Sequence, residues 1–555
     1  MKKENTQKWI IDNSKKELPM LVLLVAGNAL FAVCGVLTAL FSKNIIDCAQ
    51  NGSRSGLLRY GIILFAIFAV QIVLRMCMKS LEIRIQGKIE IRIKTNLFSN
   101  ILKKDYMKIT QIHSGELMTR LTSDVSVITD GVTSILPSVV SMATRLISAL
   151  ALLFILDKTF AVILAAAGTI LFLFTRLFRG KMKSLHKRVQ ESDGKVRSFM
   201  QEAIESMLVV KIFDVEEKIR NQSTEIQGEN YDAKIVRNRW SIFANTGFSA
   251  AFSFGYLFAI IWSGLRLLAG SISFGTLTAV IQLVNQVQTP VTSLSGILPK
   301  YYSMLASADR IIEIENMPES KALNSADIDT KQIYDELRSI EFKNITFGYG
   351  RDTIIENSSF SINKGDFVVI SGISGIGKST LFKLMVGVLQ PQGGEVFINS
   401  GGKKLFADKF TRPLFAYVPQ GNMLMSGTIR DNIKFVNDTA SDSEVLNAAE
   451  ISCALDFIKE LPKGLDTVLY ENGRGLSEGQ IQRLAVARAV LSGAPVILLD
   501  EATSALDEET ETKMLKNIKS LKNKTCVIIS HKQAAFCICD AEIIVSEKKV
   551  KKNKL

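Results

Sequence analysis

Residues 372–379, GISGIGKS, combine glycines and side chains suited to binding phosphate. They fit the pattern G-x-x-x-x-G-K-[ST], in which backbone N–H groups of a glycine-rich loop point at phosphates and the following helix adds its positive N-terminal end. Lys378 is expected to reach the β- and γ-phosphates, and Ser379 is expected to bind Mg²⁺. The other positions expected to contact a nucleotide here are Gly372, Ser374, Gly375, Gly377 and Thr380.

A second segment, PVILLDEATSALD at residues 495–507, is an apolar run that ends in two adjacent carboxylates. Asp500 can hold the same Mg²⁺ from the opposite strand, and Glu501 is placed to polarise a water molecule. A match to the phosphate-loop pattern alone can arise by chance, but a buried strand is predicted before the loop and a helix after it. Together the two segments predict binding and hydrolysis of a nucleoside triphosphate.

The chain as a whole has 555 residues, enough for two or more domains. Hydrophobic residues make up 47% and the mean hydropathy is +0.21, which is high for a soluble enzyme. The formal charge of +13 fits a nucleic-acid binder or a membrane protein with basic cytoplasmic loops. Seven cysteines without a C-x-x-C pair argue against a disulfide framework or a zinc site. No cleavable signal peptide is expected, because the first apolar segment is long and lacks a cleavage-like end.

Six apolar segments of membrane-spanning length precede residue 300, and none has an Asp or Glu in its apolar core. A span needs about 20 such residues, and a buried helix of a soluble protein rarely repeats that length six times. The predicted spans are residues 19–42, 57–78, 135–156, 159–178, 242–266 and 276–298.

The distribution of Lys and Arg predicts the orientation of these spans. The loops 79–134 and 177–240 carry nine and thirteen basic residues, whereas the three loops on the other side carry two, one and none. Both termini and the two long loops are therefore expected in the cytoplasm, and nucleic-acid binding is rejected because the basic excess is mostly a topology signal. Residues 5–18, with Trp9 among lysines, predict either an interfacial helix or a solvated charged tail.

The two long inner loops are too long and too periodic for simple connections. Residues 79–110 and 180–235 predict helices that extend the spans far into the cytoplasm. Their tips, near residues 114–124 and 209–219, are candidates for docking onto another domain. Residues 306–337 are polar and include Pro318, which predicts a linker.

From about residue 338 the pattern changes to short β-rich runs that alternate with helices, which is typical of an α/β domain. Seven signals follow in order: Tyr349, the phosphate loop, Gln420 in VPQ, LSEGQ at 476–480, ILLDE at 497–501, SALD at 504–507, and His531 after the strand CVIIS. This series resembles the nucleotide-binding domain of an ATP-binding cassette (ABC) transporter. Six spans followed by one such domain resemble a half-transporter of the exporter type, and the resemblance covers nearly the whole chain.

The resemblance implies a fold class and a domain order. The fold is expected to combine a membrane α-helical domain with six spans and a cytoplasmic α/β phosphate-loop nucleotide-binding domain. The membrane domain would comprise residues 1–305, the linker residues 306–337 and the nucleotide-binding domain residues 338–555.

The resemblance also assigns roles at the nucleotide. Tyr349 would stack on the adenine of ATP, although a lone aromatic can equally belong to the core. Ser379 and Asp500 would serve Mg²⁺, and Gln420 would link Mg²⁺ and the attacking water to the membrane domain.

Three further residues are implied to act on the γ-phosphate or across the subunit boundary. Glu501 would be the general base, or would at least polarise the water. His531 would contact the γ-phosphate, although a lone histidine is more often a core residue. Asp507 belongs to the loop that crosses between subunits in the family.

The segment LSEGQ implies the stoichiometry. In the family it faces the phosphate loop of a second nucleotide-binding domain, and this chain has one copy of each motif, so a dimer with itself or with a related chain is implied. Ser477, Gly479 and Gln480 would cap the γ-phosphate at the start of a helix. Glu478 departs from the commonest pattern, LSGGQ. Its carboxylate either points harmlessly to solvent or weakens ATP capture in one half of a heterodimer, and a positive φ there would strain it.

The implied mechanism is alternating access, in which ATP binding closes the nucleotide domains and hydrolysis resets them. The cargo stays open between a lipid, an amphipathic peptide and a hydrophobic drug, and the lack of acidic residues in the spans argues against a polycation. Polar residues share one face of the last predicted span, which predicts that this face either lines a substrate pathway or forms interhelical hydrogen bonds. That face carries Gln282, Asn285, Gln286 and Thr289, and further polar positions within the spans are Arg145, Gln71 and Arg75.

Three rival functions fit the residues less well. An ATP-dependent gate, or a regulatory half of a heterodimeric complex, would use the same motifs, but intact Glu501 argues against it because a gate tolerates lost hydrolysis. Importers of this superfamily usually keep membrane and nucleotide domains on separate chains. A soluble ABC protein acting on ribosomes or DNA is excluded by the six spans. The expected location is the cytoplasmic membrane of a bacterium, in contact with membrane lipids.

Overall fold

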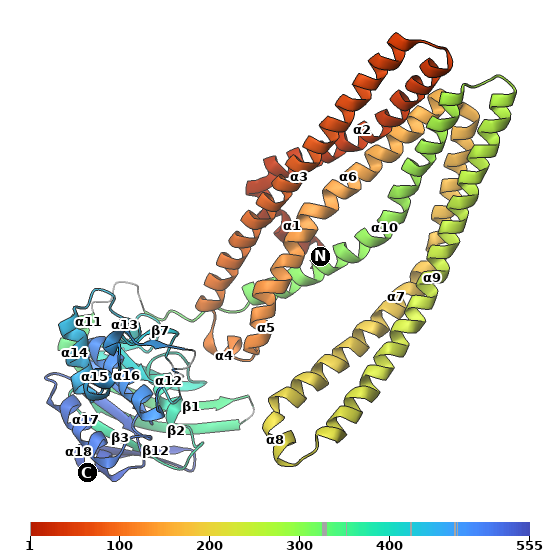
Figure 1. Cartoon of the computed structure of the whole chain (residues 1–555). Coiled ribbons are helices and arrows are strands. Elements are labelled where there is room, and N and C mark those ends of the chain that lie inside the picture. The colour runs from red at the N-terminus through yellow and green to blue at the C-terminus, as the bar shows by residue number, and fades with distance from the viewer. Residues whose placement is uncertain (1, 325–329, 351, 422–423, 471–472, 474) are drawn as a thin grey trace. The chain divides into compact units, whose positions relative to one another are not determined.

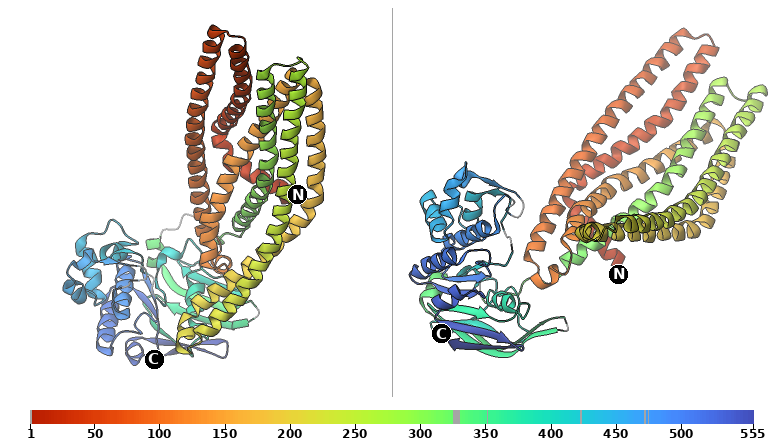
Figure 2. Two further views of the ribbon diagram at one scale, coloured as in Figure 1. Left: turned by 45° about the vertical axis from the view of Figure 1, so that its right-hand side comes forward. Right: turned by 60° about the horizontal axis from the view of Figure 1, so that its bottom comes forward.

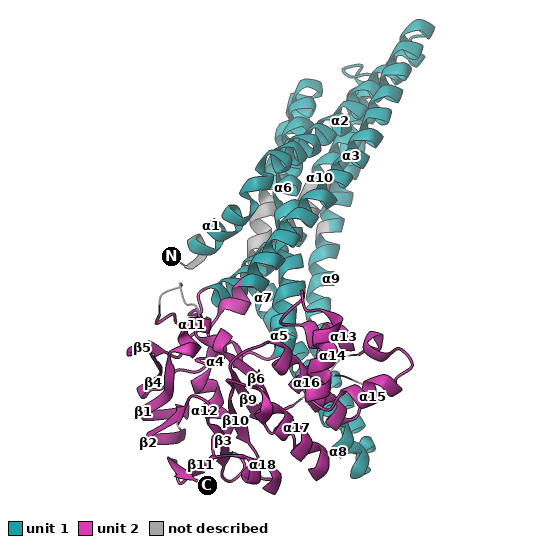
Figure 3. Ribbon diagram, turned by 90° about the vertical axis from the view of Figure 1, so that its left-hand side faces the viewer, with its two compact units in different colours: residues 1–99, 114–315 teal, residues 100–113, 316–555 magenta. Residues whose placement is uncertain are grey.

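The computed structural model covers the whole chain and describes residues 2–324, 330–350, 352–421, 424–470, 473 and 475–555. These residues divide into two compact units, which Figure 3 colours separately. Unit 1 comprises residues 1–99 and 114–315, and unit 2 comprises residues 100–113 and 316–555. Unit 2 therefore includes a short piece of chain that is flanked on both sides in the sequence by helices of unit 1.

Unit 1 is built from long helices, seen from three directions in Figures 1 and 2. The helices that carry its length are α2 (Leu18–Gln50), α3 (Arg54–Lys103), α6 (Val125–Leu156), α7 (Lys158–Glu205), α9 (Glu216–Leu268) and α10 (Phe274–Glu315). The shorter ones are α1 (Lys2–Ser14), the 3₁₀ turn η1 (Lys15–Glu17), α5 (Ser114–Thr119), the π-helical turn η2 (Arg120–Asp124) and α8 (Met207–Ile212).

Each of the six predicted spans lies within one of the six long helices. Among the described residues, four helical stretches are long and apolar enough to cross a membrane, namely Asn5–Gln50, Arg54–Lys103, Ser114–Leu156 and Glu216–Leu268. The long helices run beyond the predicted spans, so the two inner loops are largely helical, as their periodicity predicts. A helical bundle suits a membrane because each helix satisfies its backbone hydrogen bonds internally.

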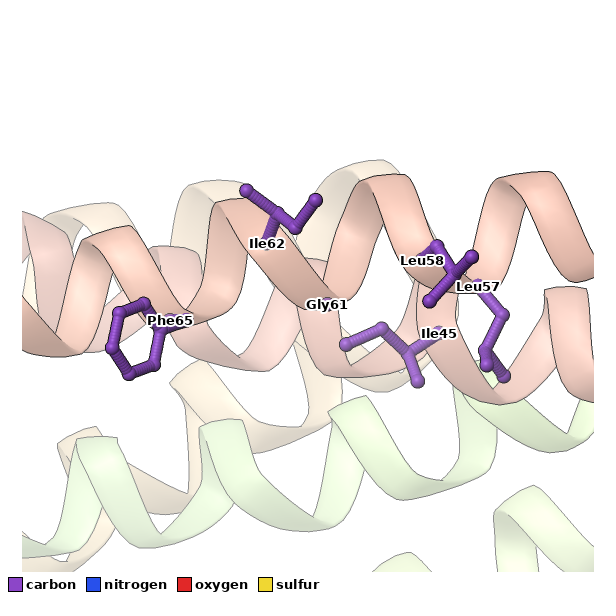
Figure 4. Close-up of a pocket in the computed structure, with 6 residues that line it drawn as sticks. All are labelled: Ile45, Leu57, Leu58, Gly61, Ile62 and Phe65. Carbon is purple, nitrogen blue, oxygen red and sulfur yellow. The ribbon is translucent and has the colours of Figure 1, made fainter.

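Packing within unit 1 joins α6 to α2 and α10, and α7 to α9 (Figures 1 and 2). A buried cluster that includes Val36, Leu153, Phe160 and Leu283 marks the centre of the bundle. The helices α2 and α3 enclose an apolar groove of about 400 Å³, shown in Figure 4. Its lining residues are Ile45, Leu57, Leu58, Gly61, Ile62 and Phe65.

The predicted linker, residues 306–337, is partly helical in the structure. Helix α10 continues to Glu315, the short helix α11 occupies Thr330–Asp335, and strand β1 begins at Leu337. The polar residues 306–315 are helical because one face of this helix is buried, with Ala308, Ile311 and Ile314 inaccessible to solvent.

The N-terminal residues form helix α1, so the alternative of a solvated tail is wrong. The Trp9 indole Nε1 donates a hydrogen bond of 2.7 Å to Glu315 Oε2, and the Thr6 hydroxyl donates to Asp309. Both acceptors lie on α10, and α1 packs against that helix.

The first predicted docking tip, residues 114–124, stays a prediction; Arg120 and Asp124 within it are buried inside unit 1, whereas Glu116 is exposed. Asp124 is 2% exposed and accepts hydrogen bonds from Ser307 Oγ, at 2.9 Å, and from the Arg310 guanidinium. Arg120 donates to the Arg310 backbone oxygen at 2.8 Å. Residues 100–113 belong to unit 2, where helix α4 (Tyr106–Ile109) is found. The second predicted tip, 209–219, includes the end of α8 and stays a prediction.

Unit 2 contains two main sheets, visible as arrows in Figures 1 and 3. The antiparallel sheet has the order β2-β1-β4-β5, with β1 Leu337–Tyr349, β2 Asp352–Asn363, β4 Gly393–Ser400 and β5 Lys403–Phe406. The second sheet has the order β12-β11-β3-β10-β9-β6, with β3 Phe367–Ser371, β6 Phe415–Val418, β9 Val496–Asp500, β10 Thr525–Ile529, β11 Ala541–Ser546 and β12 Lys549–Lys554. A small ribbon pairs β7 (Gly427–Thr428) with β8 (Val468–Leu469).

Helices and buried apolar strands complete unit 2. The strands β3, β9 and β10 are almost entirely buried, which explains their continuous apolar sequences. The helices are α12 (Lys378–Met385), α13 (Ile429–Lys434), α14 (Asp442–Ile451), α15 (Leu455–Glu460), α16 (Glu478–Leu491), α17 (Glu508–Ser520) and α18 (Gln533–Ile538), with 3₁₀ turns at Arg412–Leu414 and Gly464–Asp466.

Candidate functional site

Strand register brings the predicted site residues to one edge of the six-stranded sheet. Strands β6, β9, β10, β3 and β11 are parallel, and Ile529 pairs with both Ile370 and Asp500. The residues that leave the carboxyl ends of these strands therefore lie side by side. In open α/β sheets this edge is where ligands bind. The four segments that start there are the phosphate loop, Asp500 with Glu501, Ser530 with His531, and Pro419 with Gln420.

The phosphate loop adopts a conformation that requires glycine. Gly372, Gly375 and Gly377 have φ of +145°, +80° and +110°. A Cβ atom at Gly377 would lie 2.3 Å from Ile354 Cγ2, and one at Gly372 would lie 2.5 Å from the Val545 backbone oxygen. The loop is thus held tightly against neighbouring strands, with Ser374 exposed at its turn.

Lys378 is the first residue of α12, and its side chain folds back over the loop. Its ammonium donates to the backbone oxygens of Gly372 and Ile373, at 2.7 and 3.2 Å, and to His531 Nε2 at 3.0 Å. The side chain is buried whereas His531 is exposed. The cation and the imidazole predicted to meet the phosphates are therefore already adjacent.

Asp500 is held by two hydroxyl groups. Ser379 Oγ donates to its Oδ1 and Tyr417 OH donates to its Oδ2, each at 2.9 Å. Burial raises the pKa of the Asp500 carboxyl above its ordinary value, against the opposing effect of the two hydroxyl donors. A hydroxyl and a carboxylate side by side are hard oxygen ligands that suit Mg²⁺, which binds through one or two carboxylates and substrate phosphates. The described residues contain no group of three His, Cys, Asp or Glu that could hold a metal by themselves.

Glu501 sits directly after this strand in a strained backbone conformation. Its φ is +52°, and its N–H donates to the Ile529 backbone oxygen at 3.1 Å. A non-glycine residue in this region costs about 1–3 kcal/mol and is maintained only by its surroundings. Its side chain accepts a hydrogen bond of 2.7 Å from Gln420 Nε2, so the two residues predicted to flank the attacking water touch each other.

Tyr349 ends strand β1 beside the helix that follows the phosphate loop. Its hydroxyl lies 3.5 Å from Thr380 Oγ1, and its ring meets Phe347 edge-on with centroids 5.1 Å apart. The side chain is 40% exposed, so one side of the ring is open to a ligand. Thr380 itself is buried.

The segment LSEGQ begins helix α16 with a reciprocal cap. Ser477 is the N-cap and accepts from the Gln480 backbone N–H, while Gln480 Oε1 accepts from the Ser477 N–H at 2.8 Å. Glu478 is the first helical residue and is exposed. Its φ is not positive, so the strain considered for this position does not arise. A carboxylate in the first turn also suits the helix dipole. Gly479 permits close packing, because a Cβ there would lie 2.9 Å from the Ala505 backbone oxygen.

The same helix is joined to the segment SALD. Gln482 Nε2 donates to Ser504 Oγ at 2.9 Å, and the Ala505 N–H donates to Gln482 Oε1 at 3.1 Å. Asp507 caps α17 by accepting the Thr510 N–H at 2.9 Å, and this bond holds the pKa of Asp507 below its usual value. The two predicted inter-subunit segments therefore form one continuous surface of unit 2.

The polar side chains on one face of α10 differ in their burial. Gln286 Nε2 donates to the Gly35 backbone oxygen on α2 at 3.1 Å, as the interhelical alternative predicts. Gln282 and Asn285 are exposed, and the Thr289 side chain lies outside the described residues. Arg145 is half-buried within α6, whereas in α3 Gln71 is half-buried and Arg75 exposed.

Two elements near the site do not carry a recognisable sequence motif. Tyr417 donates to Asp500 from strand β6, and Met107 of α4 packs against the apolar core that Tyr417 also borders. The only signal for Tyr417 was a hydroxyl-bearing ring inside an otherwise apolar strand, FAYV. Residues 106–109 gave none, because they continue the helical pattern of the preceding loop.

Comparisons with known proteins agree over both units. Residues 20–291 match the family model described as the ABC transporter transmembrane region, and residues 355–504 match the one described as ABC transporter. A putative export ATP-binding/permease protein of Rickettsia bellii is 28% identical over 543 residues, which are 96% of this chain and 92% of that protein. The ATP-dependent lipid A-core flippase of Photobacterium profundum is 29% identical over 469 residues, covering 83% of this chain and 79% of that protein.

Other relatives are longer than this chain. ABC transporter B family member 1 of Dictyostelium discoideum is 28% identical over 99% of the chain, which spans 60% of that protein, and the chain spans 31% of a second Dictyostelium relative. Among solved structures, a bacterial Atm1-family ABC exporter with ATP bound has the same fold, with a TM-score of 0.80 at 22% identity. The match covers 96% of this chain and 95% of that one.

Proposed function

Because this chain belongs to the ABC transporter family as an exporter-type half-transporter, we propose that it uses ATP to export, or flip outward, an amphipathic substrate across a membrane. Family membership confirms the resemblance, and the helical transmembrane domain followed by an α/β nucleotide-binding domain confirms the fold class. The observation that supports hydrolysis most directly is the convergence of Lys378, Ser379, Asp500, Glu501 and His531 at one sheet edge.

These residues divide the work of hydrolysis. The loop amides and the N-terminus of α12 receive the phosphates, and the Lys378 ammonium neutralises their charge. Glu501 accepts the proton of the attacking water, while Gln420, hydrogen-bonded to it, orients that water. His531, 3.0 Å from the Lys378 ammonium, would contact the γ-phosphate, and Tyr349 would stack on adenine.

Mg²⁺ would be held by Ser379 and Asp500, with Gln420 at the edge of the site. When bound it supplies positive charge to the phosphate oxygens as the terminal phosphate leaves. The oxygen-rich pair of Ser379 and Asp500, with its two oxygens 2.9 Å apart, supports this assignment.

The active form in this proposal is a dimer. Ser477, Gly479, Gln480 and Asp507 would face the phosphate loop of the second half-transporter, and ATP would fill the space between. Glu478 points to solvent at the start of α16 and leaves the Ser477 cap intact, which favours the harmless interpretation of this substitution. A working homodimer is therefore our proposal, with a related partner chain as the other outcome of the test.

A lipid-like substrate is favoured over a peptide or a drug. Two of the relatives are named as lipid A-core flippases, at 29% and 28% identity. The exposed amides of Gln282 and Asn285 on α10 could bind a polar headgroup while apolar faces of the bundle accommodate acyl chains. The proposal puts both termini and the nucleotide-binding domain in the cytoplasm, which the basic inner loops support, and the bacterial relatives support a bacterial membrane.

The first test is ATP hydrolysis by the purified chain in lipid nanodiscs, with Glu501→Gln beside wild type and the exposed Glu508→Gln as a control. We expect wild type and Glu508→Gln to turn over ATP, and Glu501→Gln to lose at least about 100-fold while it still binds ATP. Turnover unchanged in Glu501→Gln would refute the assignment of the base. Folded wild type that binds ATP without turnover would refute the homodimer and lead to a search for a partner chain.

Transport itself is tested in liposomes with fluorescent phospholipids. ATP-dependent movement of the lipid to the far leaflet, absent in Glu501→Gln, is the expected result. Hydrolysis without movement of any amphipathic probe would favour the alternative of a gate or regulatory half.

A further inference from the structure

Tyr417 occupies an unusual place for a residue outside the known motifs. It lies on β6, whose neighbour is the strand that ends in Asp500. Its hydroxyl donates to Asp500 Oδ2 at 2.9 Å, and Ser379 donates to the other oxygen at the same distance. Asp500 is 1% exposed, so this carboxylate cannot replace either donor with bulk water.

The Tyr417 ring is fixed as well as its hydroxyl. It meets the Phe382 ring edge-on, with centroids 5.9 Å apart and planes at 83°. Phe382 belongs to α12, the helix that begins at the phosphate loop. Burial and the neighbouring Asp500 carboxylate raise the pKa of Tyr417, so the phenol remains a proton donor at neutral pH.

Helix α4 borders the same apolar core as Tyr417. This helix is anchored in unit 2, because the Asp105 N–H donates to the Pro318 backbone oxygen and Lys104 Nζ donates to that of Met317, both at 2.9 Å. Met107 of α4 and the Tyr417 ring both pack against that core.

Helix α12 gives α4 a second contact near the site. The Lys383 ammonium lies 5.8 Å from the centroid of the Tyr106 ring. Lys383 is adjacent in sequence to Phe382, the ring that packs on Tyr417. The route from α4 to the Tyr417 ring therefore runs through α12, by way of Lys383 and Phe382.

We propose that Tyr417 is a positioning residue that turns Asp500 Oδ1 toward Ser379 for Mg²⁺ binding and makes this orientation depend on the position of α4. This inference rests on the proposed function, since it concerns the metal used in ATP hydrolysis. It differs from the role of Gln420, which bonds Glu501 on the water side of the site, whereas Tyr417 bonds the carboxylate on the metal side.

The test uses Tyr417→Phe in the full chain, because phenylalanine keeps the ring packing and removes only the donor. Tyr334→Phe is the matched control, since Tyr334 is buried in the same unit and its hydroxyl lies 3.2 Å from Thr525 Oγ1, far from the motif residues in the sequence. Two quantities are measured for each variant in nanodiscs: the Kd of a fluorescent ATP analogue in EDTA, and the free Mg²⁺ concentration that half-saturates tightening of its binding.

We expect Tyr417→Phe to bind the analogue in EDTA within about twofold of wild type and to need about tenfold more Mg²⁺, the factor for one charge-assisted hydrogen bond. Tyr334→Phe should leave the Mg²⁺ requirement unchanged. A half-saturation concentration does not depend on the fraction of folded protein, so partial misfolding cannot produce the shift. An unchanged Mg²⁺ requirement in Tyr417→Phe, or an equal shift in Tyr334→Phe, would overturn the inference.

The link to α4 is tested by a double-mutant cycle with Tyr106→Ala. If Tyr417 carries the link, Tyr106→Ala should raise the Mg²⁺ requirement in the wild-type background and have little further effect in Tyr417→Phe. Fully additive shifts would overturn this part. Wild type without any Mg²⁺-dependent binding would instead count against the proposed function, so the two failures are distinguishable.

Discussion

The buried ion pair of Asp124 and Arg310 allows a prediction whose size can be worked from the structure. It joins η2 to α10 through two residues that are 186 positions apart in the chain. Asp124 is 2% exposed and accepts from Ser307 as well as from two nitrogens of the guanidinium. Asp124→Asn keeps the shape of the side chain and removes its charge.

The expected loss in the free energy of unfolding of Asp124→Asn lies between two limits. Breaking a buried pair costs about 3–5 kcal/mol when the remaining charge cannot reach water, and a hydrogen bond to a charged group is worth about 1.5–3 kcal/mol. The Arg310 side chain is 47% exposed, so it can recover part of its hydration. We therefore expect the free energy of unfolding to fall by about 2 kcal/mol, which lowers the melting temperature by about 3 °C if unit 1, with about 300 residues, unfolds as one body.

Helix α10 also supplies the control. Lys300 on α10 pairs with Asp130 on α6 at 3.3 Å, but these side chains are 56% and 49% exposed. An exposed pair contributes about 0–1 kcal/mol, so Asp130→Asn should lower the melting temperature by less than about 2 °C. Melting is followed by tryptophan fluorescence in nanodiscs. If Asp124→Asn melts no lower than Asp130→Asn, the pair does not hold α10 and the reasoning fails.

Three further outcomes are expected from unit 2. Replacing Tyr349 by Ala should raise the Kd for ATP about tenfold, since base stacking is worth about 1–3 kcal/mol, whereas Tyr349→Phe should keep the wild-type Kd. Equal Kd values for wild type and Tyr349→Ala in a fluorescence titration would contradict stacking. Glu478→Gly should leave the KM for ATP within about twofold and slightly lower the melting temperature, because glycine is a poor helix residue; a KM tenfold lower would show that the carboxylate weakens capture. Asp408 is buried, which by itself raises the pKa of its carboxyl. The backbone N–H groups of Asn324 and Leu323 donate to this carboxylate and hold the pKa below its usual value. Its stabilising contribution is then present above about pH 4 and lost at lower pH, so Asp408→Asn should destabilise the chain to urea at pH 6 but much less at pH 3; an equal effect at both would refute this.

The phosphate loop, the paired carboxylates and the spans could be identified from sequence because each signal is local. The pattern G-x-x-x-x-G-K-[ST] needs only its own strand, turn and helix, and the positive φ of Gly372, Gly375 and Gly377 explains why glycine recurs there. A membrane span likewise depends on the composition of one continuous segment.

The partners of buried charged residues in the inner loops could not be predicted from the sequence. The segment SGELMTRLTSD has the polar composition of an exposed tip, yet Arg120 and Asp124 within it are buried because α10 supplies their partners. Nothing in the sequence marks Tyr106–Ile109 as the piece that packs within unit 2. Residues 306–315 likewise read as polar linker but are helical, since one face of them is buried.

The sequence by itself indicated the candidate residues for binding phosphate, the segments apolar enough to cross a membrane and, through its resemblance to a family, the proposal of a dimer. Only the tertiary structure decided that Tyr417 holds Asp500, that Glu501 adopts a left-handed backbone, and that α1 and η2 secure the end of α10. The reason is physical: the local signals depend on neighbours within a few positions of the chain. The partner of a buried polar group is instead set by strand register and helix packing between segments that are far apart in sequence.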